Sequence, residues 1–255
     1  MSPTPIQRLA SAAAAPLVLF GCAARTVDYP PETPRGQIAT QPGRPGFVVA
    51  APHASSDAHT GAIAAEVARR TGFGLVIASG FGLEADTRRR PGRRYQVNRP
   101  FEGTPSRPPS EEAASEGARR IYEAYEDRVR EAAQGPLRFY AEIHGNNRRE
   151  TSGRIEVATV GVDRELAERL RALAELVRDA HLRSRADAPR LEVLVEPADP
   201  LVYAASGAKR EGILRLPERA LHIELPRTAR VEHRELYTAI VADFVVQAVA
   251  LPRGY

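Results

Sequence analysis

The chain has 255 residues, of which 43% are hydrophobic and 27% are charged. Such proportions are ordinary for a soluble globular protein and exclude the collagen-like and intrinsically disordered classes. The 36 basic residues exceed the 32 acidic ones only slightly, and all of them except Lys209 are arginine. Because this surplus provides little charge for holding a polyanion, we expect no nucleic-acid partner.

The N-terminal segment carries the single cysteine, Cys22. Residues 1–21 place Arg8 before a run of small and apolar residues, which is the layout of a signal peptide too short to span a membrane. Residues 19–22 read Leu-Phe-Gly-Cys and resemble the lipobox of bacterial lipoproteins, in which the cysteine is lipidated. We therefore expect a lipid on Cys22 that anchors the protein in the bacterial cell envelope, on its periplasmic or extracytoplasmic side. A plain signal peptide or a buried cysteine is the alternative.

The first half of the chain predicts a linker followed by a βαβ unit. Residues 22–46 contain several prolines and no periodic apolar pattern, as in a flexible linker behind the lipidated N-terminus. Apolar runs predict buried strands over residues 47–51 and 75–78, and helical spacing over residues 60–70 ends at Gly72. Residues 84–109 are rich in arginine, proline and glycine and predict a long basic loop, which either attracts an acidic substrate or is simply solvated.

The second half continues the alternation of helices and strands. Ser110 precedes two glutamates, so we expect it to cap a helix over residues 110–133. Residues 206–212 form a second basic loop, in which Lys209 is a candidate substrate-binding residue. The whole pattern predicts a single three-layer α/β/α domain over residues 47–255 with a mostly parallel or mixed central sheet. Further helices are expected over residues 164–182 and 232–250, and strands over 137–143, 154–160, 191–195 and 220–225.

Histidines follow two of the predicted strands, at the ends where open α/β sheets place their sites. His53 comes shortly after the strand 47–51, Asp57 lies four residues later, and His144 ends the strand 137–143. An imidazole and a carboxylate at this spacing can converge on a divalent metal ion if a helical turn begins between them. Taken singly, each histidine also suits a hydrogen-bonded structural role.

Polar residues stand at two further positions. Asn98 and Arg99, fixed by Pro100, form a fork suited to a substrate carboxylate. Glu224 lies within the apolar strand 220–225, where an ionised group is costly unless it is paired, bound to metal or functional. Pairing with a buried arginine is the structural alternative for Glu224.

The order of these motifs resembles the N-formylglutamate amidohydrolase family. The chain reads His-x-x-x-Asp at 53–57, Asn-Arg-Pro at 98–100, Ile-His-Gly at 143–145 and Ile-Glu-Leu at 223–225. More distantly, this order is similar to zinc carboxypeptidases and phage poly-γ-glutamate hydrolases. The resemblance covers residues 48–227, although only the four motifs are specific. It implies a phosphorylase/hydrolase-like version of the predicted fold, and one zinc ion (Zn²⁺) held by His53, Asp57 and His144.

The resemblance also implies roles for the remaining motifs. Asn98 and Arg99 match residues that bind a substrate carboxylate, and Glu224 matches the general base. The chain departs from the carboxypeptidases at the second ligand, where they have a glutamate three residues after the histidine and this chain has Ser56. Asp57 and His59 are therefore both candidates for that ligand.

Glu142 lies two residues before His144 and so on the same face of the predicted strand. It is a candidate for orienting a ligand from behind, with a salt bridge to an arginine as the alternative.

We therefore expect a zinc-dependent hydrolase of an amide bond in a small N-acyl amino acid or a peptide with a free carboxylate. Three protein ligands leave a position for water, and a nearby carboxylate can take the proton of that water as it attacks. An envelope zinc carboxypeptidase or cell-wall peptide amidase is the enzymatic alternative. A non-catalytic envelope lipoprotein that binds ligands with the same fold is the alternative from another class.

Overall fold

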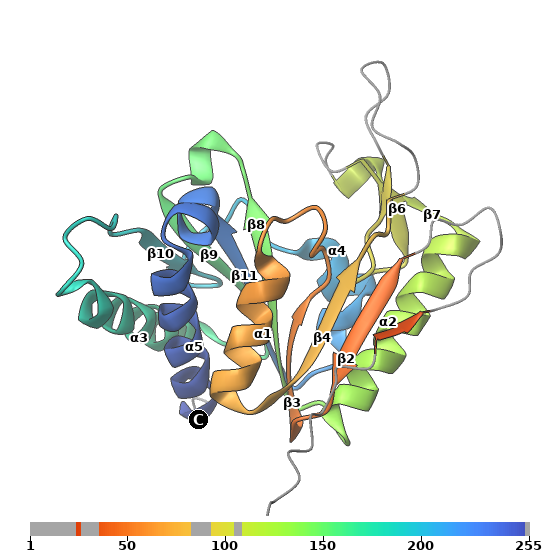
Figure 1. Cartoon of the computed structure of the whole chain (residues 1–255), viewed down its shortest axis with the longest axis horizontal. Helices are drawn as coiled ribbons and strands as arrows, with labels where there is room; N and C mark the ends of the chain where they lie inside the picture. Colours follow the sequence, from red (N-terminus) through yellow and green to blue (C-terminus); the bar gives the residue numbers. More distant parts are fainter. Residues whose placement is uncertain (1–23, 27–35, 83–92, 105–108, 253–255) are drawn as a thin grey trace, which may run out of the picture.

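The computed structural model describes residues 24–26, 36–82, 93–104 and 109–252, with only the backbone of the first of these segments (Figure 1). The expected signal segment 1–21, Cys22 and residues 84–92 of the basic loop lie outside the described residues. Among the described helices, none has the length and hydrophobicity needed to cross a bilayer.

A mixed sheet of eight strands forms the centre, in the order β1-β2-β4-β3-β8-β11-β9-β10. The four middle strands β4, β3, β8 and β11 are parallel, while β2 and β9 run antiparallel to their neighbours β4 and β11. The strands are β1 Ala24–Thr26, β2 Gln37–Gln41, β3 Arg44–Ala51, β4 Phe73–Ser79, β8 Phe139–Asn146, β9 Arg154–Val160, β10 Glu192–Val195 and β11 Arg219–Pro226. A small second sheet contains β5 Arg94–Tyr95, β6 Phe101–Gly103 and β7 Ala113–Ala114.

Helices cover both faces of the large sheet, so the domain has three layers (Figure 1). One apolar core lies under α1 Thr60–Thr71, α3 Arg164–Leu182 and α5 Arg234–Ala250. The other lies under α2 Glu116–Ala133 and α4 Ser206–Glu211. The predicted fold class, a single α/β domain with a mostly parallel or mixed central sheet flanked by helices, is confirmed.

The alternation of side chains along β8 and β11 determines where polar groups gather. Ile143 and Ile223 point into the core under α1, α3 and α5. Successive side chains of a strand point to opposite faces, so the even-numbered residues near the ends of both strands share the face toward α2. Because β8 and β11 are parallel neighbours, their carboxyl ends place these polar residues side by side.

Two sequence expectations about boundaries are wrong. Residues 22–46 are not linker throughout, because β1 and β2 pair with each other and β2 pairs with β4. The helix expected from residue 110 begins at Glu116, and its N-cap is Ser115, whose Oγ accepts a 3.1 Å hydrogen bond from the Ala118 amide. Ser110 instead lies in the 3-10 turn Pro109–Glu111, and the intervening β7 pairs with β6.

Three further segments also differ from expectation. Residues 206–211 form the helix α4 rather than a loop, and a π-helical turn over Thr228–Glu232 precedes α5. Within the long loop expected over 84–109, the described residues form β5 and β6. The strands β5 and β6 depend on pairing between segments, which a local apolar pattern does not reveal.

Candidate metal centre

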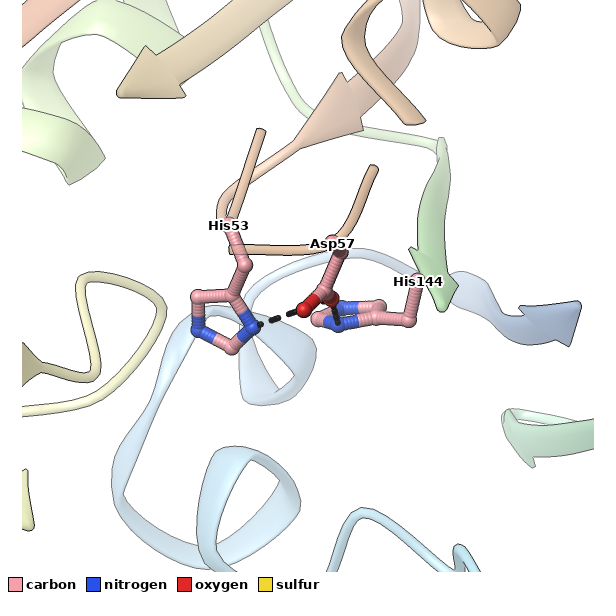
Figure 2. Close-up of side chains that lie close together, drawn as sticks. All are labelled: His53, Asp57 and His144. Carbon is pink, nitrogen blue, oxygen red and sulfur yellow. Dashed lines mark ion pairs between the residues drawn. The ribbon is translucent and has the colours of Figure 1, made fainter. Parts of the chain in front are cut away.

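His53 and His144 are brought together by parallel strands. His53 follows β3 and His144 lies near the end of β8, which pairs directly with β3. Asp57 reaches the same point because the chain turns after β3, with the amide of Asp57 donating a 2.8 Å hydrogen bond to the carbonyl oxygen of His53. Figure 2 shows the three side chains pointing toward one another. The turn that lets His53 and Asp57 converge is therefore present.

The carboxylate of Asp57 lies between the two imidazoles. Its Oδ2 is 3.6 Å from His53 Nδ1 and 3.6 Å from His144 Nδ1. Donor atoms of a tetrahedral zinc site with bonds of about 2.1 Å are about 3.4 Å apart, so these separations are close to those of a zinc site. All three residues are buried, and one ligand atom from each lies within 4.8 Å of the others. Nitrogen and carboxylate oxygen are also ligands that zinc prefers, so the residues fit this metal.

Neighbouring groups hold the rings so that each Nδ1 faces Asp57. His53 Nε2 lies 2.9 Å from the carbonyl oxygen of Gln96 and donates to it, which leaves Nδ1 as the free acceptor. The amide of Gly145 donates to Asp57 Oδ2 at 3.2 Å. His144 Nε2 is 3.3 Å from Glu142 Oε1, a contact outside hydrogen-bond geometry that acts by charge. Glu142 thus lies beside His144, and its role in orienting a metal ligand stays a prediction.

The charges of the centre shift its pKa values in opposite directions. Burial, assisted by the nearby guanidinium of Arg94, lowers the pKa of His53 to about 4. Burial also acts to lower the pKa of His144, but the Glu142 and Asp57 carboxylates outweigh it and raise that pKa to about 10. Burial acts to raise the pKa of Asp57, yet the two imidazoles hold it well below its ordinary value. Asp57 therefore stays ionised in the metal-free protein, and His53 is neutral at pH 7.

Glu224 lies next to this centre on β11. The strand register pairs it with His144 and pairs His222 with Glu142. Glu224 Oε1 is 3.2 Å from His222 Nε2, whereas the buried Oε2 has no hydrogen-bond partner among the described residues. Glu142, His144 and His222 also form a second group compact enough to hold a metal ion.

Asn98 and Arg99, the predicted carboxylate-binding residues, contact other side chains of the protein. Asn98 is buried and donates from Nδ2 to Glu142 at 3.3 Å. Arg99 donates from Nε to Glu112 at 2.8 Å and from Nη1 to the Asn98 side chain at 3.0 Å. The roles of Asn98 and Arg99 in binding a substrate carboxylate therefore stay a prediction. For this role, Arg99 would have to release Glu112 and bind the substrate carboxylate in its place.

Two further candidates lie away from the centre. Lys209 on α4 forms an ion pair with Glu196. His59, the alternative second ligand, is exposed and its Nδ1 accepts a 2.8 Å hydrogen bond from Arg234. Asp57, and not His59, therefore belongs to the group of described residues that is compact enough to hold a metal ion.

Two residues that the sequence did not single out are part of the centre. Arg94 lies 3.7 Å from Asp57 Oδ1, donates to Ser56 Oγ, and has a buried Nε without a hydrogen-bond partner among the described residues. In the sequence, Arg94 could not be told apart from the other arginines of the same basic segment. His222 lies two residues before Glu224 and therefore on the same face of the strand. This alternation of side chains could have identified His222 as part of the centre from the sequence.

The chain is similar to solved structures of low sequence identity. A gene product of Agrobacterium tumefaciens aligns with a TM-score of 0.51 at 16% identity, over 84% of this chain and 94% of that one. A bacteriophage poly-gamma-glutamate hydrolase aligns with a TM-score of 0.48 at 11% identity, over 84% of this chain and 89% of that one. A metallo-carboxypeptidase from Burkholderia cenocepacia aligns with a TM-score of 0.38 at 12% identity, over 84% of this chain and 61% of that one.

By sequence, no protein-family model and no curated protein matches the chain. The likeness to the Agrobacterium tumefaciens protein therefore describes the fold alone. The chemistry of the protein depends on the buried residues of the centre.

Proposed function

We propose that the protein is a zinc-dependent hydrolase of amide bonds. The observation that carries this proposal is the position of Asp57 Oδ2, at 3.6 Å from one ring nitrogen of each of His53 and His144. Burying two imidazoles and a carboxylate that converge on one point is costly unless they are paired or bind a cation. Their ligand types and spacing match a catalytic zinc site with three protein ligands.

Glu224 supplies the proton acceptor for such a reaction. A bound zinc ion would provide Lewis-acid chemistry and lower the pKa of water toward about 7. Glu224 belongs to the strand that pairs with the strand of His144, and its Oε2 is a buried acceptor without a partner among the described residues. In the proposed reaction, Glu224 takes the proton of the attacking water and passes it to the leaving amine.

A substrate with a free carboxylate suits the charge beside the centre. Arg94 is largely buried, and burial lowers its pKa. Its Nε is unpaired within the described part of the chain, so Arg94 has a donor available for an anionic group. The proposed substrates are therefore small N-acyl amino acids, such as N-formylglutamate, and peptides that carry a free carboxylate.

Location in the cell envelope is part of the proposal and rests on residues 1–22 alone. Cys22→Ser should move the protein from the membrane fraction to the soluble fraction of the envelope, because it removes the atom that carries the lipid. Equal membrane association of both forms would contradict the lipid anchor and leave the proposed hydrolase untouched.

Purified protein tests the hydrolase directly. We expect about one zinc ion per chain, and release of amine from N-formylglutamate, poly-γ-glutamate or a dipeptide. Glu224→Gln should retain zinc and lose turnover, because it removes the proton acceptor and no metal ligand. A ligand-binding protein without catalysis would instead bind these probes without hydrolysing them, in both forms.

A further inference from the structure

Two acids and two imidazoles alternate at the ends of β8 and β11. The parallel register places Glu142 beside His222 and His144 beside Glu224, and all four lie on one face of the sheet. The closest contact in the group is Glu142 Oε1 to His222 Nδ1 at 2.6 Å. The imidazoles of His144 and His222 also lie close together, with ring centroids 4.1 Å apart and ring planes tilted by 31°.

We infer that His222 is a positioning residue for Glu224, an inference that rests on the proposed function. Each nitrogen of the His222 ring contacts a different carboxylate: Nδ1 contacts Glu142, and Nε2 contacts Glu224 Oε1 at 3.2 Å. The hydrogen bond to His222 fixes one oxygen of Glu224. The other oxygen, Oε2, remains unpaired among the described residues and is the atom available to a proton.

Glu142 anchors this arrangement from behind. It is fully buried and lies near Asn98 Nδ2 at 3.3 Å and the Tyr140 hydroxyl at 3.3 Å, both of which donate to it. The same Oε1 that binds His222 lies 3.3 Å from His144 Nε2. Glu142 therefore restrains a metal ligand and, through His222, the proton acceptor, so the two are held in a fixed relationship.

Single substitutions can separate the two contacts of His222. In His222→Gln the amide occupies the place of Nε2 and can still donate to Glu224. In His222→Asn the amide occupies the place of Nδ1, so only the contact with Glu142 is kept. His181→Gln is the matched control, because His181 contacts Asp243 at 2.7 Å on α5 and lies outside the centre.

The variants are compared by zinc content and by kcat and KM on N-formylglutamate, poly-γ-glutamate and a dipeptide. We expect His222→Asn to lower kcat about 10- to 100-fold with unchanged KM and zinc content. His222→Gln should recover most of that loss, and His181→Gln should equal the parent protein. An unchanged kcat in His222→Asn would overturn the inference. Loss of zinc from both His222 variants would also overturn it, because His222 would then be a metal ligand.

A measurement without turnover keeps this inference separate from the proposed function. In the zinc-loaded protein, ¹⁵N NMR of the imidazoles should show the His222 Nε2 resonance shifting in Glu224→Gln, with His181 as the unaffected reference. An unmoved His222 Nε2 resonance would overturn the positioning role. If the parent protein hydrolyses none of the probes while this resonance shifts, the proposed function fails and the contact stands.

Discussion

Gly145 leaves the space that the guanidinium of Arg230 occupies. A Cβ at residue 145 would lie 2.4 Å from Arg230 Cζ, which is closer than real contacts allow. Arg230 is almost fully buried, and it donates to the carbonyl oxygens of Leu225, Ala58 and Asn146 at 3.0, 2.7 and 3.1 Å. One side chain thus ties the ends of β8 and β11 to the segment that follows β3, and these parts of the chain carry the candidate site.

Gly145→Ala should therefore destabilise the protein. The added methyl group displaces the Arg230 guanidinium and strains its hydrogen bonds, with an expected loss of about 1–3 kcal/mol of unfolding free energy. Chemical denaturation measures this change. Gly153→Ala is the matched control, because a Cβ at residue 153 meets no atom within 4 Å. Equal stability of the two variants would show that Arg230 can move aside freely.

Arg94 should affect binding of a substrate carboxylate more than its neighbour Arg93 does. Arg94 lies 3.7 Å from Asp57, whereas Arg93 pairs with Glu102. Arg94→Gln should raise KM for N-formylglutamate about tenfold, because a charge-assisted hydrogen bond is lost. Arg93→Gln should leave KM unchanged. A KM that changes equally in both variants would favour general attraction by the basic segment over a specific contact.

Zinc binding should release about one proton at pH 6. The pKa of His144 is raised to about 10, so its imidazole is protonated at pH 6 in the metal-free protein. Zinc requires the neutral form of this imidazole, which must therefore lose its proton. His53 has a pKa of about 4 and is already neutral, so it releases none. Apparent zinc affinity should therefore rise with pH from 6 toward 10.

Calorimetry in buffers of different ionisation enthalpy counts the protons released at pH 6, where zinc-bound water with a pKa of about 7 contributes little. Glu142→Gln should release fewer protons, because it removes the charge that contributes most to raising the pKa of His144. Proton release that is absent from the parent protein would contradict the charge state assigned to His144.

The start of α2 provides a test of the fold. Ser115→Ala should cost about 1 kcal/mol of unfolding free energy, because Ser115 Oγ accepts the Ala118 amide at the helix N-terminus. Ser110→Ala should cost little, since Ser110 is exposed in a separate turn. A larger loss from the Ser110 variant would place the helix start where the sequence alone suggested.

The sequence predicts what depends on local pattern. Helix α3, Arg164–Leu182, and strand β9, Arg154–Val160, have the expected boundaries because apolar residues recur there at the periods of a helix and a strand. The approach of His53 to His144 also follows from sequence, because both lie near the ends of predicted strands in a mostly parallel sheet.

What the sequence missed depends on contacts between distant segments. Strand β2 looks like linker until it pairs with β4. The small size of Gly145 leaves room for Arg230, which lies 85 residues later in the chain. The local sequence around Arg99 suggests a residue that binds a substrate carboxylate, yet its guanidinium forms an ion pair with Glu112. Partners of this kind become visible only in three dimensions.

The most direct test of the central claim is the anomalous scattering of zinc in crystals of the zinc-loaded protein. We expect one ion at about 2.1 Å from His53 Nδ1 and His144 Nδ1 and about 2.0 Å from a carboxylate oxygen of Asp57. An ion bound by Glu142, His144 and His222 instead, or no ion in the zinc-loaded crystals, would contradict it.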